Sequence, residues 1–136
     1  MTRGERNNNP GNIRRLPKGE RWIGELENED DPAFCQFDSP EDGIRALAKT
    51  LLTYQRSHNL NTIRDIISRW APASENDTDA YVYAVSQDCN VTPTQVLDLN
   101  DSATLALLCK AIIRHENGRV IYSDDQVNQS VERALA

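Results

Sequence analysis

The segment that most constrains the fold is an apolar run in the last third of the chain, ending at Gly118. Four of its residues are spaced by three or four positions and therefore share one face of a helix: Leu105, Leu108, Ile112 and Glu116. We expect the helix to stop at Gly118, because Asn-Gly is a common C-terminal capping signal. The buried face thus ends in a carboxylate at the rim of an apolar surface, where the charged form is disfavoured. Such an environment suits a general acid in glycoside cleavage.

Helical spacing of apolar residues extends back from this run to Ser39, which predicts a mainly helical domain. Ser39 and Pro40 are good N-cap and first-turn residues, and two acids follow them at the positive end of the helix dipole. The same reasoning predicts six helices, over about residues 40–58, 62–70, 78–89, 93–99, 102–116 and 126–135.

The N-terminal part of the chain has a different pattern. Residues 1–12 are rich in Asn and contain Pro10 and Gly11, which indicates a turn. Short extended pieces alternate with turn residues after it, so we expect a small, irregular antiparallel β lobe over about residues 12–37. The predicted fold class is α+β and mainly α, in a single domain over residues 1–136 with its helical lobe over about residues 39–136.

Composition excludes several classes of function. A net charge of −6 argues against a general nucleic-acid binder, although residues 3–21 are locally basic. No apolar run approaches the roughly 18 residues of a membrane span, so we expect no membrane insertion. The N-terminus has no apolar stretch of a signal peptide, so we expect synthesis in a bacterial cytoplasm without one. The three cysteines are widely spaced and no phosphate-binding glycine loop occurs, so we expect no metal and no cofactor.

The Asn-rich turn and the tryptophan after it are candidates for sugar binding. The side-chain amides of Asn8, Asn9 and Asn12 can both donate to and accept from sugar hydroxyl and N-acetyl groups. Trp22 offers a flat apolar face to a pyranose ring. The simpler interpretation is an Asn/Pro/Gly turn and a core tryptophan.

A second set of candidates precedes and opens the helix predicted over residues 78–89. Thr78 and Tyr81 stand at its start, and Glu75 lies in the polar loop before it. Thr78 can equally be a helix N-cap, and Glu75 can equally be an acid that favours the helix N-terminus. Both interpretations stay open at this point.

Three motifs resemble peptidoglycan-cleaving enzymes of the lysozyme-like group. The helix ending in Glu116, with Asn117 in place of a serine before Gly118, resembles the catalytic helix of lytic transglycosylases and glucosaminidases. The Asn-rich turn followed by Trp22, and the Thr78–Tyr81 segment, resemble parts of flagellar-type glucosaminidases. Their order is reversed here, which implies a circularly permuted lysozyme-like fold.

That resemblance implies cleavage of the glycan strand of peptidoglycan. Glu116 would be the general acid and later the base, and Glu75 the candidate second carboxylate. Asn8, Asn9 and Asn12 would bind substrate, together with three further residues, Trp22, Thr78 and Tyr81.

The chain as a whole also resembles small phage and prophage proteins described as virion structural proteins. The shared motifs are the opening Arg-Gly-Xaa-Arg-Asn-Asn-Asn-Pro-Gly-Asn-Ile-Arg, the Ser39–Ala46 segment and Arg69–Pro72. This resemblance implies a phage or prophage origin, association with other virion proteins and carriage in the virion or delivery to the periplasm. It also supports an alternative function, a non-enzymatic virion or host-interaction protein on the same fold. A nucleic-acid or anti-defence role rests only on the basic N-terminal stretch and ranks last.

Overall fold

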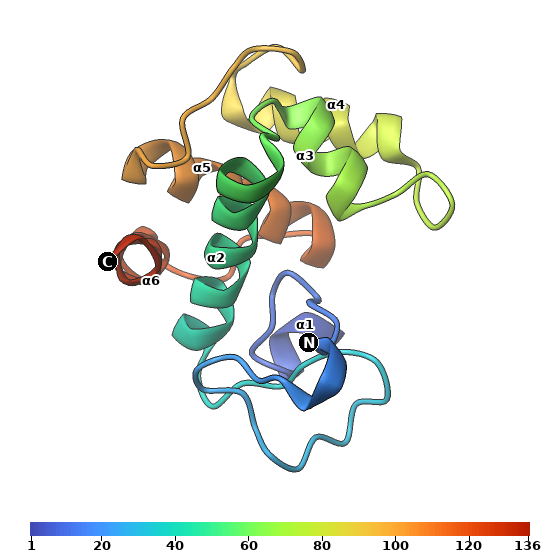
Figure 1. Ribbon diagram of the computed structural model, residues 1–136, viewed down its shortest axis with the longest axis vertical. Helices are drawn as coiled ribbons and strands as arrows, with labels where there is room; N and C mark the ends of the chain where they lie inside the picture. The colour runs from blue at the N-terminus through green and yellow to red at the C-terminus, as the bar shows by residue number, and fades with distance from the viewer.

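The computed structural model describes all of residues 1–136 and is mainly helical (Figure 1). Its helices are α1 (Arg3–Arg6), α2 (Pro40–His58), α3 (Ile63–Trp70), α4 (Thr78–Cys89), α5 (Ser102–Asn117) and α6 (Asp124–Leu135), with a 3-10 turn η1 (Pro17–Gly19). Five of the six expected helices are therefore confirmed, and α1 was not expected. Thr2 caps α1 by accepting a hydrogen bond from the Glu5 backbone N–H.

The prediction of a helix over residues 93–99 is wrong, because this segment is a turn followed by an irregular stretch. Its backbone groups bond to neighbouring elements instead of to one another. The Leu97 N–H donates to the Asn61 carbonyl at 2.7 Å, and the Leu99 N–H donates to Gln55 Oε1 at 2.7 Å. Tertiary hydrogen bonds have thus replaced the local helical ones.

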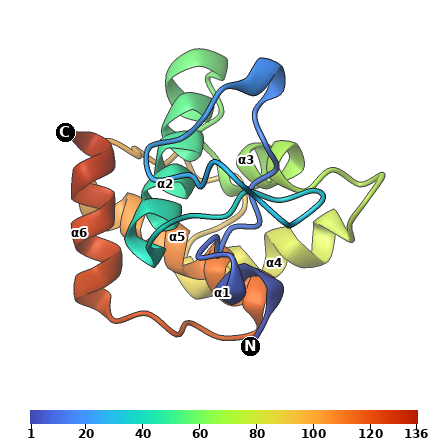
Figure 2. The ribbon, with the colours of Figure 1, turned by 90° about the horizontal axis from the view of Figure 1, so that it is seen from below.

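One apolar core of 28 buried residues runs through the molecule, as expected for a single domain. Helix α5 lies at its centre and packs against α2, α4 and α6, while α6 also lies along α2 (Figures 1 and 2). The apolar face predicted for α5 is confirmed, because Leu105, Leu108 and Ile112 are all at most 1% exposed. No helix of the chain has both the length and the apolarity to cross a membrane.

The β lobe expected over residues 12–37 is not a sheet. It contains two isolated antiparallel bridges, Arg14 with Phe34 and Glu25 with Phe37, within irregular chain that lies below the helices in Figure 1. Positive φ angles at Lys18 and Gly24 interrupt the extended pieces. Much of the hydrogen bonding comes from side chains, so the lobe keeps its shape without a ladder.

Buried carboxylates hold this N-terminal lobe together. Asp31 accepts two hydrogen bonds from the Arg3 guanidinium and one from Asn7 Nδ2, and is 8% exposed. The Arg3 hydrogen bond is the main reason that the pKa of Asp31 lies far below its usual value. Glu29 pairs with Arg15 at 3.2 Å in the same lobe.

The N-terminus lies beside the end of α5, whereas the C-terminus lies at the far end of α6 (Figure 2). The start of the chain is joined to α5 by the hydrogen bond from the Thr2 hydroxyl to Asn117 Oδ1.

Candidate functional site

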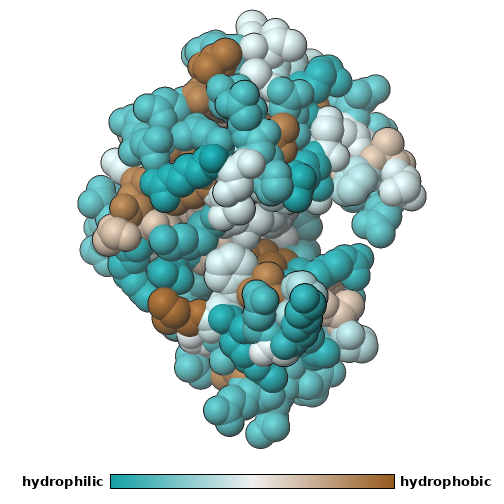
Figure 3. All heavy atoms as spheres, viewed as in Figure 1, coloured by the Kyte–Doolittle hydropathy of each residue, from teal (hydrophilic) through white to brown (hydrophobic).

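A groove of about 860 Å³ separates the N-terminal lobe from the helices. The space-filling view shows the molecule hollowed between these two parts (Figure 3). One wall comes from residues 11–14 and from Leu16, Glu20, Trp22 and Phe34, and the other from α2, α3, the loop after α3 and the end of α5. The groove is of the size that usually holds a small ligand or a few sugar units.

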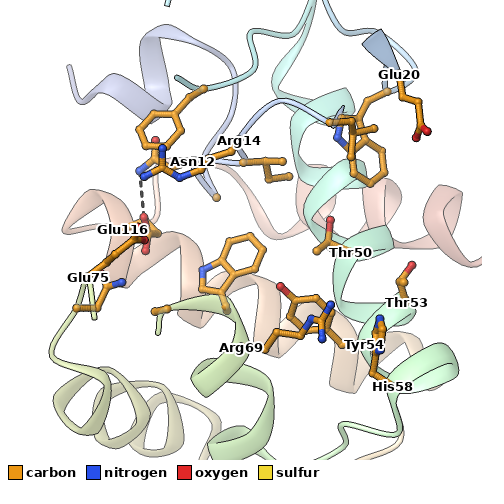
Figure 4. A pocket seen from close by; sticks show the side chains of 18 residues that line it. Asn12, Arg14, Glu20, Thr50, Thr53, Tyr54, His58, Arg69, Glu75 and Glu116 are labelled. Carbon is orange, nitrogen blue, oxygen red and sulfur yellow. Dashed lines mark hydrogen bonds between the residues drawn. The ribbon is translucent and has the colours of Figure 1, made fainter. Parts of the chain in front are cut away.

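Glu116 stands in the last turn of α5 and lines one end of this groove (Figure 4). Its Oε1 accepts a hydrogen bond from Asn12 Nδ2 at 3.0 Å, and its Oε2 accepts one from the Tyr81 hydroxyl at 2.8 Å. The carboxylate is partly buried and held from two sides, by the N-terminal turn and by α4. Each of its oxygens keeps a second lone pair for a ligand.

Tyr81 supports Glu116 from behind rather than lining the groove. It is 2% exposed, and its ring stacks on His115 with ring centroids 3.7 Å apart. Burial, followed by the nearby Glu116 carboxylate, raises the pKa of Tyr81 far above its usual value. The hydroxyl therefore keeps its proton and acts as a fixed donor to Glu116.

The three asparagines of the N-terminal turn have different positions. Asn12 adopts a left-handed backbone conformation, with a φ of 51°, and its side chain lines the groove and reaches Glu116. Asn9 is fully buried, and its amide bonds only to the backbone of Ile13 and Cys35. Asn8 donates to the Phe37 carbonyl. Asn8 and Asn9 therefore shape the turn, and neither is among the residues that line the groove.

Of the remaining expected residues, two line the groove and one does not. Glu75 is exposed and lines the groove at the end that also holds Glu116 (Figure 4). Trp22 also lines the groove, and its buried Nε1 has no hydrogen-bond partner. The Thr78 hydroxyl instead donates to the Ala71 carbonyl at 2.5 Å and is not part of the lining. Asp77, rather than Thr78, is the N-cap of α4.

Asn117 is a key residue whose role the sequence pattern did not reveal. It is buried, and its Nδ2 donates to the Pro10 carbonyl at 2.8 Å and to the Ile113 carbonyl at 2.9 Å. Its Oδ1 accepts from the Thr2 hydroxyl at 2.7 Å. Gly4 permits this approach, because a Cβ there would lie 2.7 Å from Asn117 Oδ1. Asn117 thus ties the N-terminal turn to the end of α5, which places Asn12 beside Glu116.

Two arginines also line the groove, although the sequence analysis did not select them as site residues. Arg14 lies over the Phe34 ring, with its Cζ 5.1 Å from the centroid, and Arg69 lies over the Tyr54 ring at 5.2 Å. Neither has a carboxylate oxygen within 4.0 Å. They bring two positive charges to the groove of a protein that is acidic overall.

One set of potential metal ligands lies outside the groove, formed by Glu25, Glu29 and Cys35 with ligand atoms within 4.8 Å of one another. Arg21 already pairs with both carboxylates, at 3.6 and 3.1 Å, and Arg15 pairs with Glu29. Burial first, and then the two glutamates, raise the pKa of the Cys35 thiol to about 12. A metal would have to displace the arginines and the thiol proton, so this set is better described as an ion-pair cluster.

Comparison with known proteins places the chain among phage proteins. No family model matches it. It is 41% identical over 131 residues to Protein P5 of Pseudoalteromonas phage PM2, and the match covers 96% of this chain and 80% of Protein P5. The chain therefore belongs to the family of Protein P5. This finding confirms the expected relationship to phage proteins.

Proposed function

We propose that this phage-family protein cleaves the glycan strand of peptidoglycan and that Glu116 is its proton donor. The observation that carries the proposal is the position of Glu116 in the groove wall, with its two oxygens oriented by Asn12 and Tyr81. A carboxyl group held in a fixed direction, in a groove that can take a sugar chain, is suited to general acid catalysis. On this proposal the fold is a lysozyme-like variant.

The proton transfers follow from this geometry. Protonated Glu116 gives its proton to the glycosidic oxygen, and the bond from that oxygen to the anomeric carbon breaks. Asn12 and Tyr81 then donate to the carboxylate that remains. In the second step this carboxylate takes a proton, either from the 6-hydroxyl of the same sugar as it closes an anhydro ring, or from an attacking water. The two routes define a lytic transglycosylase and a hydrolase.

Glu75 is the candidate second carboxylate for the hydrolytic route. It lines the same end of the groove as Glu116 but belongs to an exposed loop before α4 (Figure 4). Glycosidases that use two carboxyl groups hold them about 5–9.5 Å apart. Asn12 and Trp22 would contact the sugars directly, while Asn8, Asn9 and Thr78 would act by shaping the groove. Virion proteins would be partners if the enzyme is carried in the particle.

A second candidate is a non-enzymatic virion or host-interaction protein on the same fold. Membership of the Protein P5 family supports it directly, because that relationship concerns phage proteins and implies no chemistry. The bonds of Glu116 also fit a purely structural role, since they join the N-terminal turn, α4 and α5. The family relationship therefore favours this candidate, whereas the groove favours the enzyme.

Digestion of purified peptidoglycan separates the two candidates. We expect the chain to release reducing ends or anhydro-muropeptides, and Glu116→Gln to lower the rate by about 10²–10⁴-fold. The glutamine oxygen can still accept from Asn12 while its amide donates to the Tyr81 hydroxyl, so the fold should survive. Glu132→Gln, on the exposed face of α6, is the matched control and should cleave normally.

Each result bears on one candidate. No products from the unaltered chain over a range of pH would favour the virion protein. Products from Glu116→Gln at the normal rate would show that the groove cleaves glycan but that Glu116 is not its acid. The kind of product distinguishes the two chemical routes.

A further inference from the structure

The arginines of the groove differ from most basic residues of this chain. Eight other lysines and arginines have a carboxylate oxygen within 4.0 Å: Arg3, Arg15, Arg21, Arg64, Lys110, Arg114, Arg119 and Arg133. Arg14 and Arg69 have none, although the chain has a net charge of −6. Five other lysines and arginines also have none, but they do not line the groove: Arg6, Lys18, Arg45, Lys49 and Arg56. The charges of Arg14 and Arg69 are therefore free to act on whatever occupies the groove.

The aromatic residues beneath these arginines leave them able to bind. Stacking on Phe34 and Tyr54 uses the flat face of each guanidinium and leaves the N–H groups at its edge free to donate. Tyr54 does not neutralise Arg69, because burial raises the pKa of Tyr54 and keeps its hydroxyl protonated. Each ring thus holds a guanidinium in place, and although Arg69 also interacts with the Tyr54 hydroxyl, neither arginine spends its N–H groups on a carboxylate.

The two arginines stand on different walls of the groove. Arg14 comes from the N-terminal lobe, near the end that holds Asn12 and Glu116, and Arg69 comes from α3 beside Tyr54 (Figure 4). This placement provides two separate cationic contacts along the groove rather than a single clamp. It suits a chain that carries anionic groups on more than one unit.

We propose that Arg14 and Arg69 form a carboxylate-binding subsite that makes the groove select acidic glycans over neutral glycans with the same sugar backbone. The ligand class is a glycan whose sugar units bear carboxylate substituents, and the proposal rests on glycan binding in the proposed function. The guanidinium edge matches a carboxylate with two parallel hydrogen bonds. The subsite also explains how an acidic protein approaches an anionic polymer, since Glu20, Glu75 and Glu116 line the same groove and would otherwise repel it.

A binding experiment with chemically matched ligands tests this subsite. The probes are soluble glycan oligomers from peptidoglycan with free carboxyl groups, and the same oligomers after their carboxyl groups are converted to neutral amides. Dissociation constants are measured by calorimetry for Glu116→Gln, which binds without cleaving, alone and combined with Arg14→Gln or Arg69→Gln. Arg6→Gln, an exposed arginine outside the groove, is the control for the change in net charge.

We expect amidation of the ligand to weaken binding at least about tenfold, the usual scale of one charge-assisted hydrogen bond. Arg14→Gln and Arg69→Gln should each weaken binding of the acidic oligomer by about the same factor and leave the amidated oligomer nearly unaffected. Arg6→Gln should change neither. High salt should reduce the preference for the acidic ligand.

Equal affinity for the two oligomers would overturn the proposal and leave glycan cleavage intact. Equal losses for both oligomers in the arginine variants would also overturn it, because the arginines would then act only through the shape of the groove. Failure of both oligomers to bind would overturn the subsite and glycan cleavage together. Arginine-dependent binding without any cleavage would support the subsite and refute the enzyme.

Discussion

The bond network of Asn117 predicts a large effect from a nearly isosteric change. In Asn117→Asp, the two N–H groups that bond to the Pro10 and Ile113 carbonyls are replaced by an oxygen. The Pro10 carbonyl then loses its donor and faces a buried acceptor, whereas the Ile113 carbonyl keeps the helical hydrogen bond from the Asn117 backbone N–H. An unsatisfied buried polar group costs about 1–3 kcal/mol, so we expect the free energy of unfolding to fall by about that amount. The Thr2 hydroxyl can still donate to the new side chain, so this third hydrogen bond is kept and adds nothing to the loss.

Equilibrium unfolding in urea measures this loss. With a slope of about 1–3 kcal/mol per molar urea, a loss of about 1–3 kcal/mol should lower the midpoint by roughly 0.3–3 M. Asn128→Asp, on the exposed face of α6, makes the same chemical change and should stay within about 0.5 kcal/mol. The loss in Asn117→Asp should shrink at acid pH, because the protonated carboxyl regains one donor. A loss below about 1 kcal/mol at neutral pH would refute the claim that Asn117 fastens the N-terminal turn to α5.

Two further changes probe the contacts of the N-terminal lobe. In Gly43→Ala the new Cβ would lie 1.8 Å from the Asn8 carbonyl oxygen. Alanine normally stabilises a helix by about 1 kcal/mol over glycine. Because of the clash, we instead expect the free energy of unfolding to fall by about 2 kcal/mol or more, measured by thermal or urea unfolding. For Asp31, the pKa in the folded protein is lowered chiefly by Arg3, so its contribution is complete above the unfolded value of about 3.9 and is lost as the pH falls below it. Asp31→Asn should therefore flatten the loss of stability with acid, as measured by urea unfolding on either side of about pH 4.

Local patterns in the sequence predicted the helices well and failed where tertiary contacts decide. The apolar spacing and the Asn-Gly stop of α5 depend only on neighbouring residues, and the structure has both. The segment around Pro93 has equally good local signals, yet its backbone bonds to Gln55 of α2 and to Asn61 in the loop between α2 and α3. No spacing within that segment reveals such partners. The extended pieces of the N-terminal lobe failed to form a sheet for a similar reason, since side chains such as Asp31 and the Asn9 amide supply much of its hydrogen bonding.

In the candidate site, too, local patterns identified some residues and missed those whose role depends on tertiary contacts. Glu116, Asn12 and Tyr81 were selected separately along the sequence, and the structure joins them by bonds that span 104 and 35 residues. Asn117 was visible only as part of a helix stop, because its partners Pro10 and Thr2 lie more than a hundred positions away. Arg14 and Arg69 belong to the motifs shared with phage virion proteins, but stacking on an aromatic ring across the fold leaves no trace in spacing, so the sequence did not mark them as groove residues.

The groove also bears on the choice between an enzyme and a virion protein. The bonds of Glu116 suit either function, because a carboxylate that joins three segments stabilises the fold whether or not it reacts. The arginines are different. Their guanidinium groups stack on aromatic rings and pair with no carboxylate, so they do not contribute to such a network. Surface ion pairs add little to the free energy of unfolding. A guanidinium without a carboxylate partner adds to it only when an anion binds in the groove. A purely structural groove would be expected to pair these charges internally, as the N-terminal lobe does with Arg3, Arg15 and Arg21. The unpaired arginines therefore favour a groove that binds an acidic ligand, and whether the ligand is then cleaved depends on Glu116.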